Sequence, residues 1–600
     1  MTLNSTVERV TDRIRARSEG ARKTYLDRMA AAVADGPRRA HLTCGNQAHA
    51  YAPMGQDKDA LVAEKAPNIG IITAYNDMLS AHQPFETYPA KIREAARAAG
   101  GTAQVAGGVP AMCDGVTQGQ TGMELSLFSR DVIALAAGVG LSHNVFDAAL
   151  YLGVCDKIVP GLIMASATFG YIPGLFVPAG PMTSGLPNDE KAKVRQEFAK
   201  GNIDRAELMK AEMASYHGPG TCTFYGTANT NQMLMEFMGM HLPGASFVNP
   251  DTELREALTT AATTRALEIT ALGNDYTPVS DILDERAFVN GLVGLMATGG
   301  STNLVLHLPA MARAAGVILD LEDFSDLSAV TPLMAKVYPN GLADVNHFHA
   351  AGGLQFMIGN LLEAGLLHDD VKTVAGQGLS HYAKDPKFAD GRITYDAGPK
   401  ETLNDKILRP ASDPFAPQGG LVQLSGNLGR GVIKVSAVAP ERHIIEAPVR
   451  VFHEQHDVKA AFNAGELTED VIIVVRFQGP KSNGMPELHS LTPTLAVLQD
   501  RGLKVALVTD GRMSGASGKV PAAIHVAPEA ADGGPLALLR DGDVVRLDAT
   551  TGSLTCMTDL TDRQPAVADL TGNGTGVGRE LFEMFRQTVG PSTDGAAVVL

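Results

Sequence analysis

The sequence is poor in cysteine and has no excess of basic residues. Its five cysteines, an odd number, are scattered at positions 44, 113, 155, 222 and 556, unlike a disulfide framework. Lys and Arg number 50 against 66 Asp and Glu, which gives a formal net charge of −16. Because nucleic-acid phosphates are held mainly by clustered Lys and Arg, this balance argues against a nucleic-acid partner. The sequence therefore indicates a protein of the reducing cytoplasm, in which an anionic substrate would need a local basic pocket.

Long unbroken apolar stretches are also absent. The first 25 residues alternate in charge and contain no apolar core, so they predict a solvated helix and not a signal peptide. The longest uncharged run lies between Lys157 and Asp189 and is interrupted by prolines at 160, 173, 178, 181 and 187. A membrane helix of ~20 residues would tolerate these prolines badly. We expect buried strands and loops here, and no membrane segment.

Glycine and short apolar runs, by contrast, are plentiful. The chain has 63 glycines in 600 residues, with 45% hydrophobic and 19% charged residues, which is typical of a compact α/β enzyme. This length exceeds what one hydrophobic core usually organises, so two large domains are expected. Apolar runs at 69–74 and 175–177 alternate with a helical stretch at 131–139. That rhythm predicts an α/β fold with parallel strands covered by helices.

The composition and periodicity of the sequence change after about residue 380. Residues 384–417 are rich in Asp, Gly, Pro and Lys without sustained periodicity, which predicts a long surface connection. We place the domain boundary there, with an N-terminal α/β domain at 1–395 and a C-terminal β-rich domain at 396–600. In the second domain, 471–477 and 505–508 are predicted to be buried strands, and 541–555 a hairpin.

Three cysteines lie in glycine-containing, turn-like segments. Cys113 is in GGVPAMCDGVTQGQTGM, Cys155 in YLGVCDKIVPG and Cys222 in YHGPGTCTFYGTANTNQ. Thiolates are soft ligands that suit iron–sulfur clusters and zinc. Spacing alone favours small buried hydrophobic residues, because no C-x-x-C pair is present, and a structural zinc site usually has paired ligands. We interpret Cys44 and Cys556 as small hydrophobic residues.

Carboxylates accompany these cysteines. Asp114 and Asp156 directly follow Cys113 and Cys155, and Glu487 lies in GPKSNGMPELHSLTP. Carboxylate oxygens suit Mg²⁺, although each of these residues taken alone is typical of a helix cap or a surface acid.

A buried strand runs into a glycine-rich turn at VALVTDGRMSGASGKVP, which carries Ser514. A serine alkoxide stabilised by a metal or a positive charge could act as a base there, and an ordinary serine turn is the alternative. The segment is not a nucleotide loop, because Met513 and Val520 replace the required glycine and hydroxyl residue, and it lacks G-x-S-x-G. His347 and His349, in NHFHAAGG, fit packing in a loop better than a metal site.

Together these segments resemble the dihydroxy-acid dehydratase and 6-phosphogluconate dehydratase family. The resemblance is carried, in order, by AYNDMLSAHQPF, CDGVTQGQTGMELSLFSRD, GVCDKIVPG, GTCTFYGTANTNQM, ATGGSTN, LSGNLGRGVIK, GPKSNGMPELH and TDGRMSGASGKVPAAIHVAPEA. CDGVTQGQTGMELS, HGPGTCTFYGTANTNQMLMEFMGM and DVNHFHAAGG are most similar to the 6-phosphogluconate dehydratase branch. The resemblance implies a second domain similar to the swivelling β-barrel of aconitase, and a homodimer.

The same resemblance implies a hydro-lyase of the Entner–Doudoroff route. It would convert 6-phospho-D-gluconate to 2-dehydro-3-deoxy-6-phospho-D-gluconate, using a Lewis-acidic iron of an iron–sulfur cluster. The alternatives are a dehydratase of a non-phosphorylated sugar acid or of a dihydroxy acid. A non-catalytic iron–sulfur sensor that binds RNA or protein is disfavoured by the acidic charge.

Carried over by position, Cys155 and Cys222 match cluster ligands of the family. Asp114, Asp156 and Glu487 match Mg²⁺ ligands of the dihydroxy-acid branch, Lys157 its carbamylated lysine and Ser514 its base. The third cluster cysteine of that branch falls on Ala81, in YNDMLSAHQ. We therefore hypothesise that Cys113 is the third ligand, of a [4Fe-4S] cluster with one iron open to substrate.

The substrate phosphate should be bound by basic side chains and loop amides. The candidates are Arg430, Lys434, Arg512 and the GGST loop of residues 299–302, which contains Ser301.

Overall fold

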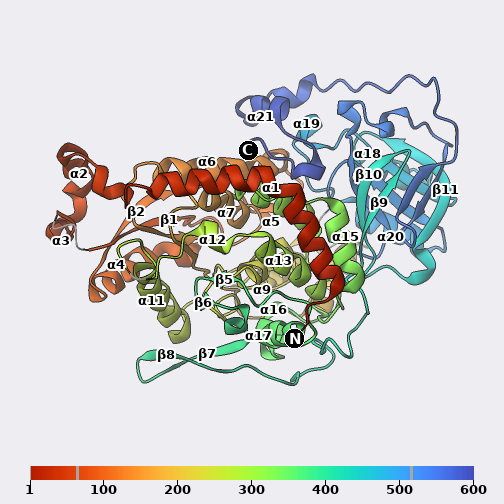
Figure 1. The fold of residues 1–600 in the computed structure, drawn as a ribbon. Coiled ribbons are helices and arrows are strands. Elements are labelled where there is room, and N and C mark those ends of the chain that lie inside the picture. Colours follow the sequence, from red (N-terminus) through yellow and green to blue (C-terminus); the bar gives the residue numbers. More distant parts are fainter. Residues whose placement is uncertain (1, 63–65, 200, 274, 514–517) are drawn as a thin grey trace.

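A four-stranded parallel sheet forms the centre of the N-terminal domain (Figure 1). In this computed structural model, which describes residues 2–62, 66–199, 201–273, 275–513 and 518–600, the strand order is β2-β1-β3-β4. The strands are β1 (Asn68–Thr73), β2 (Thr102–Gly108), β3 (Ala148–Leu152) and β4 (Gly174–Phe176). β1 and β3 are buried at every position, as expected of parallel strands covered on both faces. All neighbouring pairs are parallel, so the carboxyl ends of β1, β2 and β3 share one edge.

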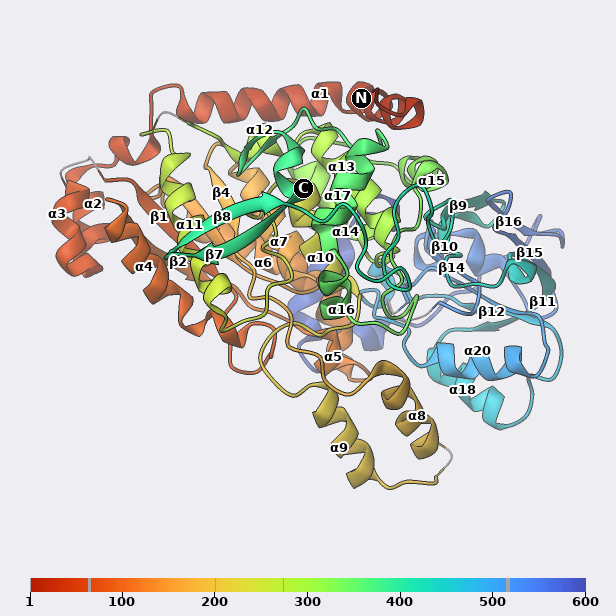
Figure 2. The ribbon, with the colours of Figure 1, turned by 90° about the horizontal axis from the view of Figure 1, so that it is seen from below.

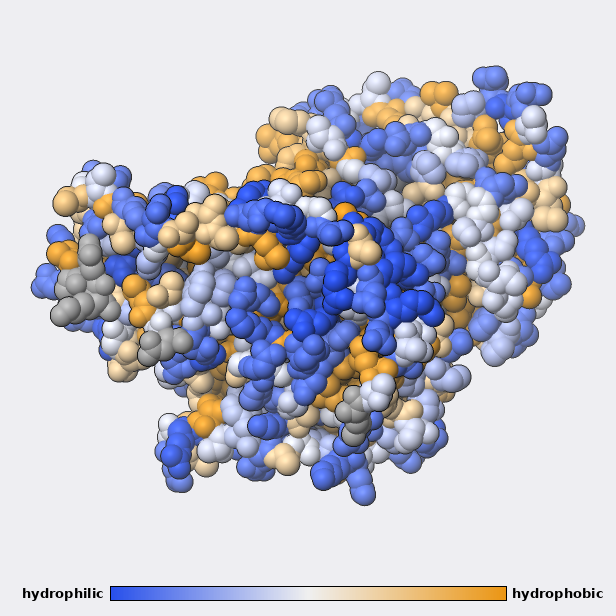
Figure 3. Space-filling model, in the orientation of Figure 1, coloured by the Kyte–Doolittle hydropathy of each residue, from blue (hydrophilic) through white to orange (hydrophobic). Residues whose placement is uncertain are grey.

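Helices surround this sheet. The main ones are α1 (Ser5–Val33), α4 (Tyr88–Ala98), α6 (Ser126–Leu141), α10 (Thr227–Phe237), α11 (Glu253–Glu268), α13 (Glu285–Thr298), α14 (Leu304–Ala314), α15 (Leu321–Val330) and α17 (Gly353–Glu363). The long α1 is joined to α15 by ion pairs to the buried Asp323 carboxylate, from Arg13 (2.8 Å) and Arg17 (2.6 Å). The surface over the region where α1 and α15 lie side by side in Figure 1 is strongly hydrophilic (Figure 3).

The uncharged run after Lys157 contains a helix that the proline pattern did not predict. α7 spans Ile158–Thr168 and packs against α6 and α14. Pro160 is the third residue of α7, within the first turn, where backbone N–H groups have no acceptor inside the helix. Proline therefore costs no hydrogen bond there, and the expectation of strands and loops alone was wrong.

The C-terminal region forms a closed eight-stranded barrel in the order β10-β14-β13-β12-β11-β15-β16-β9. Its strands are β9 (Leu421–Gly426), β10 (Gly429–Lys434), β11 (Ile444–Phe452), β12 (Val471–Val475), β13 (Val505–Thr509), β14 (Ala522–Ala527), β15 (Val544–Asp548) and β16 (Ser553–Cys556). Side chains from these strands, including Leu424, Val474 and Leu547, form a separate apolar cluster. The predicted strands at 471–477 and 505–508 and the hairpin at 541–555 are confirmed as β12, β13 and β15–β16. The α/β fold with a β-barrel-like second domain is confirmed.

The connection between the two domains is partly ordered into a hairpin. β7 (Lys384–Ala389) and β8 (Arg392–Ala397) pair antiparallel, and both contact α11. The predicted boundary at 395/396 falls inside β8. Beyond the barrel the chain returns to the N-terminal domain: Arg130 on α6 donates to the carbonyl oxygens of Gly595 (2.8 Å) and Ala596 (2.9 Å). In the described part of the chain, no helix combines the length and apolar character needed to cross a membrane.

Candidate active site

The loops that follow β1, β2 and β3 carry most of the predicted site. Cys113 precedes the short α5 (Asp114–Thr117), a few residues after β2, and Cys155 lies three residues after β3. The carboxyl ends of parallel strands are where α/β folds place their ligand sites. Sequence positions some 40 residues apart are thereby brought to one edge.

The structure brings three predicted cysteines together. The Cys155 thiol donates to the Cys113 sulfur, and this bond is the main reason that the pKa of Cys113 falls to about 7 and that of Cys155 rises. Burial, followed by the charge of Cys113, raises the pKa of Cys222 to about 12. All three are free thiols. The exposed Cys44 and the barrel residue Cys556 are not part of this group among the described residues.

Ala81 lies between the loops that carry Cys155 and Cys222. The Ser80 carbonyl oxygen accepts from the backbone of Gly220 (2.7 Å), two residues before Cys222. The His82 ring bonds the carbonyl of Val154 (3.1 Å), which precedes Cys155. Ala81 is therefore held between the two other cysteine loops, and it is buried without offering a ligand. The third thiol that interacts with Cys155 and Cys222 is that of Cys113.

A group of three carboxylates adjoins the thiols. One oxygen from each of Asp114, Asp156 and Glu487 lies within 4.8 Å of the others, a grouping that can hold a metal ion. The fully buried Lys157 ammonium bonds Asp114 and also Asp156 (2.5 Å). The fully buried Arg512 guanidinium donates to Glu487 (3.1 Å) and Asp114 (3.4 Å). Three acids and two cations thus share one site.

Charge compensation sets the protonation of this group. Burial and Arg512 act against the Lys157 charge, but the three carboxylates outweigh them and raise its pKa. Burial opposes the Asp156 charge too, yet Lys157 and His307 hold its pKa well below the ordinary range. For Glu487 burial prevails and raises the pKa to about 7. Glu487 is the carboxyl of this group that changes charge near neutrality.

Several residues that support the site had no role assigned from the sequence. Asn303 donates to Glu487 (2.9 Å), and Asn231 donates to the carbonyl oxygens of Cys155 (3.0 Å) and Asp156 (2.9 Å). The buried His307 contacts the Asp156 carboxylate (3.3 Å). Both asparagines lie in motifs quoted above, ATGGSTN and GTANTNQM, so the motifs were the signal and only the individual roles were missing.

The residues predicted to bind the substrate do not lie together in the structure. Ser301 is buried and its hydroxyl bonds that of Thr227 (2.8 Å), which also accepts from Asn303. Arg512 is occupied by the carboxylate group. Arg430 lies at the other end of β10 from Lys434 and pairs with Asp320 (2.6 Å). The structure therefore joins Ser301 and Arg512 to the carboxylates and leaves Arg430 on a different ion pair.

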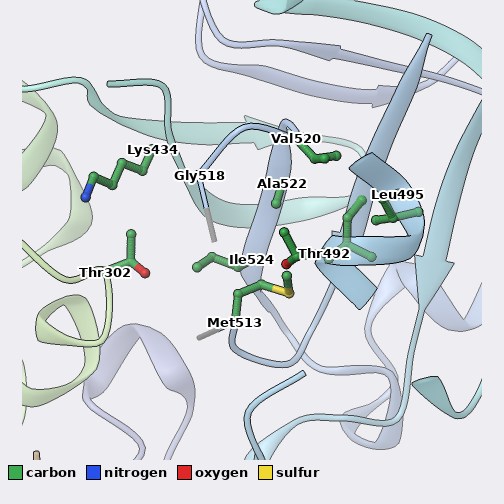
Figure 4. A pocket seen from close by; sticks show the side chains of 10 residues that line it. Thr302, Lys434, Thr492, Leu495, Met513, Gly518, Val520, Ala522 and Ile524 are labelled. Atoms are coloured by element: carbon green, nitrogen blue, oxygen red, sulfur yellow. The ribbon is translucent and has the colours of Figure 1, made fainter. Parts of the chain in front are cut away.

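A small cavity lies between the GGST loop and one end of the barrel (Figure 4). Its volume is about 30 Å³, and its lining includes Thr302, Lys434, Met513 and Gly518. The Lys434 ammonium donates to the carbonyl oxygens of Gly299 (2.7 Å) and Gly300 (3.0 Å), and burial lowers its pKa to about 8. The predicted base Ser514 lies outside the described residues, between two residues that line this cavity.

The two histidines of the NHFHAAGG segment have structural surroundings. His347 pairs with Asp344 (2.7 Å) at the start of a short helix, α16 (Val345–Ala350). Burial lowers the pKa of His349. Neither belongs to the metal-ligand group found among the described residues.

Comparison with known proteins matches both halves of the chain. Family models described as dihydroxy-acid/6-phosphogluconate dehydratase N-terminal and C-terminal match residues 66–382 and 406–596. The phosphogluconate dehydratase of Rhizobium meliloti is 63% identical over the whole length of both chains, and that of Escherichia coli K12 is 56% identical at the same coverage. The dihydroxy-acid dehydratase of Ignicoccus hospitalis is 37% identical over 82% of this chain and 87% of its own.

Proposed function

Because the chain belongs to the dihydroxy-acid/6-phosphogluconate dehydratase family, we propose that it converts 6-phospho-D-gluconate to 2-dehydro-3-deoxy-6-phospho-D-gluconate. The family makes it an enzyme of the dehydratase class. The observation that carries the substrate assignment is the full-length identity of 56–63% with phosphogluconate dehydratases, compared with 37% for a dihydroxy-acid dehydratase. The proposed setting is the Entner–Doudoroff pathway in the cytoplasm, with the chain acting as a homodimer.

We propose that Cys113, Cys155 and Cys222 hold an iron–sulfur cluster. Three free thiols from three loops interact with one another, and thiolates are the ligands that such clusters use. Three protein ligands suit a [4Fe-4S] cluster with one iron open to substrate. When bound, the cluster would supply a Lewis acid for the hydroxyl that leaves C3.

Mg²⁺ fits the three carboxylates only with a change at Lys157. At present the ammonium bonds two of the carboxylates that the cation would need. Carbamylation, expected from the family resemblance, would turn this cation into an anion and so convert a competitor into a ligand. Arg512 would remain as the fixed positive charge beside Asp114 and Glu487.

The proposed reaction removes a proton from C2 and hydroxide from C3, which together leave as water. The enol that remains then tautomerises to the 2-keto acid. Ser514 is the proposed base for the C2 proton. Thr302, which lines the cavity together with Met513 and Gly518, is the proposed donor to the carboxylate next to C2.

The experiment that tests this function compares three substrates. Enzyme prepared and reconstituted without oxygen is assayed on 6-phosphogluconate, gluconate and dihydroxyisovalerate, with keto-acid formation as the signal. A dominant rate on 6-phosphogluconate is expected, and a dominant rate on either of the others would overturn the substrate assignment. Iron and sulfide counted per chain, with the electron paramagnetic resonance spectrum, test the cluster separately.

A further inference from the structure

A pair of helices projects from the N-terminal domain and carries a lysine that the reaction described above does not use. α8 (Asn188–Ala199) and α9 (Arg205–Ser215) pack on each other and extend away from the rest of the molecule (Figure 2). At their base, the backbone of Leu186 donates to the carbonyl of Ala214 (3.0 Å). The chain then runs from α9 through Tyr216 to Cys222, so the base of this arm adjoins one of the three thiols.

Lys191 lies at that base. Its Nζ stands 3.9 Å from the centroid of the Tyr216 ring, and its charge acts on the Cys222 thiol. The side chain is only partly exposed. One turn further along α8, Arg195 is held by Glu212 through two bonds of 2.6 and 2.9 Å. Within the described residues, Lys191 has no carboxylate at ion-pair distance, and Glu212, whose charge acts on it, is paired with Arg195.

The four site cations described above are occupied. Lys157 and Arg512 are bound to the three carboxylates, and Arg430 is bound to Asp320. Lys434 is bonded to two backbone carbonyls at the cavity. Lys191 is thus a cation whose charge acts on the Cys222 thiol and which no described acid compensates at ion-pair distance. Burial and Arg195 accordingly lower its pKa to about 8.

The proposed substrate has a matching anion. With its C3 hydroxyl directed to the thiols, the phosphate is separated from the reacting carbon by C4, C5, C6 and an ester oxygen. Its cation must therefore lie near the thiols without competing for them. A lysine that packs on the ring of Tyr216, six residues before Cys222 in the chain, and whose charge reaches that thiol meets this requirement.

We propose that Lys191 binds the substrate phosphate and so gives the site its preference for a phosphorylated sugar acid. This inference rests on the proposed function, since it assumes 6-phosphogluconate as the substrate. Lys191 acts through binding and takes no part in moving protons.

The test replaces Lys191 by Gln, which is one bond shorter and removes the charge while keeping a polar end, and uses Lys193→Gln as the matched control. Lys193 lies on the same helix and is exposed. Loss of a charged hydrogen bond predicts a drop in kcat/KM on 6-phosphogluconate of roughly 10- to 100-fold, carried by KM, with the slow rate on gluconate unchanged. Inhibition by inorganic phosphate should weaken in parallel, and Lys191→Arg should restore most of the loss.

The outcomes separate this inference from the proposed function. If the unaltered enzyme prefers gluconate or dihydroxyisovalerate, the proposed function itself fails. If it prefers 6-phosphogluconate and Lys191→Gln keeps that preference, or loses activity equally on both sugar acids, only the role of Lys191 is refuted. Thermal unfolding of each variant shows whether a loss of activity reflects a loss of folding.

Discussion

Replacing Arg512 by methionine should destabilise the metal-free protein strongly. The guanidinium is fully buried and donates to the Met485 carbonyl (2.8 Å), to Glu487 (3.1 Å) and to Asp114 (3.4 Å). It therefore links a loop of the N-terminal domain to residues near the barrel. Methionine has a similar length and keeps most of the apolar contacts, so the change removes mainly the charge and its hydrogen bonds.

The magnitude follows from burial. Breaking a buried ion pair by removing one partner costs about 3–5 kcal/mol, because the remaining charge is left uncompensated. The matched control is Arg430→Met: the Arg430 and Asp320 side chains are 42% and 32% exposed, and such surface pairs contribute about 0–1 kcal/mol. The two variants make the same chemical change at opposite extremes of burial.

The assay is urea unfolding of both variants and of the unaltered protein after metal removal. Unfolding is monitored by circular dichroism and measured at several pH values. Burial raises the pKa of Glu487 to about 7 even though Arg512 lowers it, so removal of Arg512 raises that pKa further. The deficit should be largest at pH 8.5 and should shrink as the pH falls from there toward about 7, because Glu487 of the variant, whose pKa lies above that of the unaltered protein, then takes up a proton and its unpaired charge disappears. An Arg512→Met deficit no larger than that of Arg430→Met, or one independent of pH, would refute the reasoning.

The remaining predictions concern the thiols and one buried acid. Cys113→Ala should lower iron, sulfide and activity together, whereas Cys556→Ala in the barrel should not; full iron content and activity in Cys113→Ala would exclude it as a ligand. Gly220→Ala should destabilise the protein by roughly 1–3 kcal/mol and reduce iron content, because φ is +120° and an added Cβ would lie 2.3 Å from the Met182 nitrogen, two residues before a thiol. Gly218→Ala, which meets no atom within 4 Å, is its control, and equal behaviour of the two would contradict the argument. Burial raises the pKa of Glu236 from 4.5 to about 7. Its stabilising contribution is therefore fully present below pH 4.5 and is lost as the pH rises through 7. The melting temperature should fall over this pH range, and Glu236→Gln should remove the part of the fall that Glu236 causes; a fall of the same size in the variant would contradict this prediction.

Local sequence patterns predicted much of the fold. Continuous apolar runs gave β1, β12 and β13, and turn residues between alternating segments gave the β15–β16 hairpin. The helix α7 was missed because proline was weighed without its position in the helix. Pro160 costs no hydrogen bond because it lies in the first turn of the helix. Its position there depends on where the preceding loop ends.

The sequence by itself determined which residue types the site contains and which family supplies their expected roles. The cysteines, the acids beside them and the motifs around them are chemical facts of the chain, readable without coordinates. Only the tertiary structure decided their grouping. The order of β2, β1 and β3 in one sheet brings Ala81, Cys113 and Cys155 to a common edge, and the packing of the second domain brings Glu487 and Arg512 to Asp114. Which partner a charge finds, as Arg512 finds carboxylates and Lys191 an aromatic ring and a thiol, depends on distances between segments far apart in the chain, and local sequence does not encode those distances.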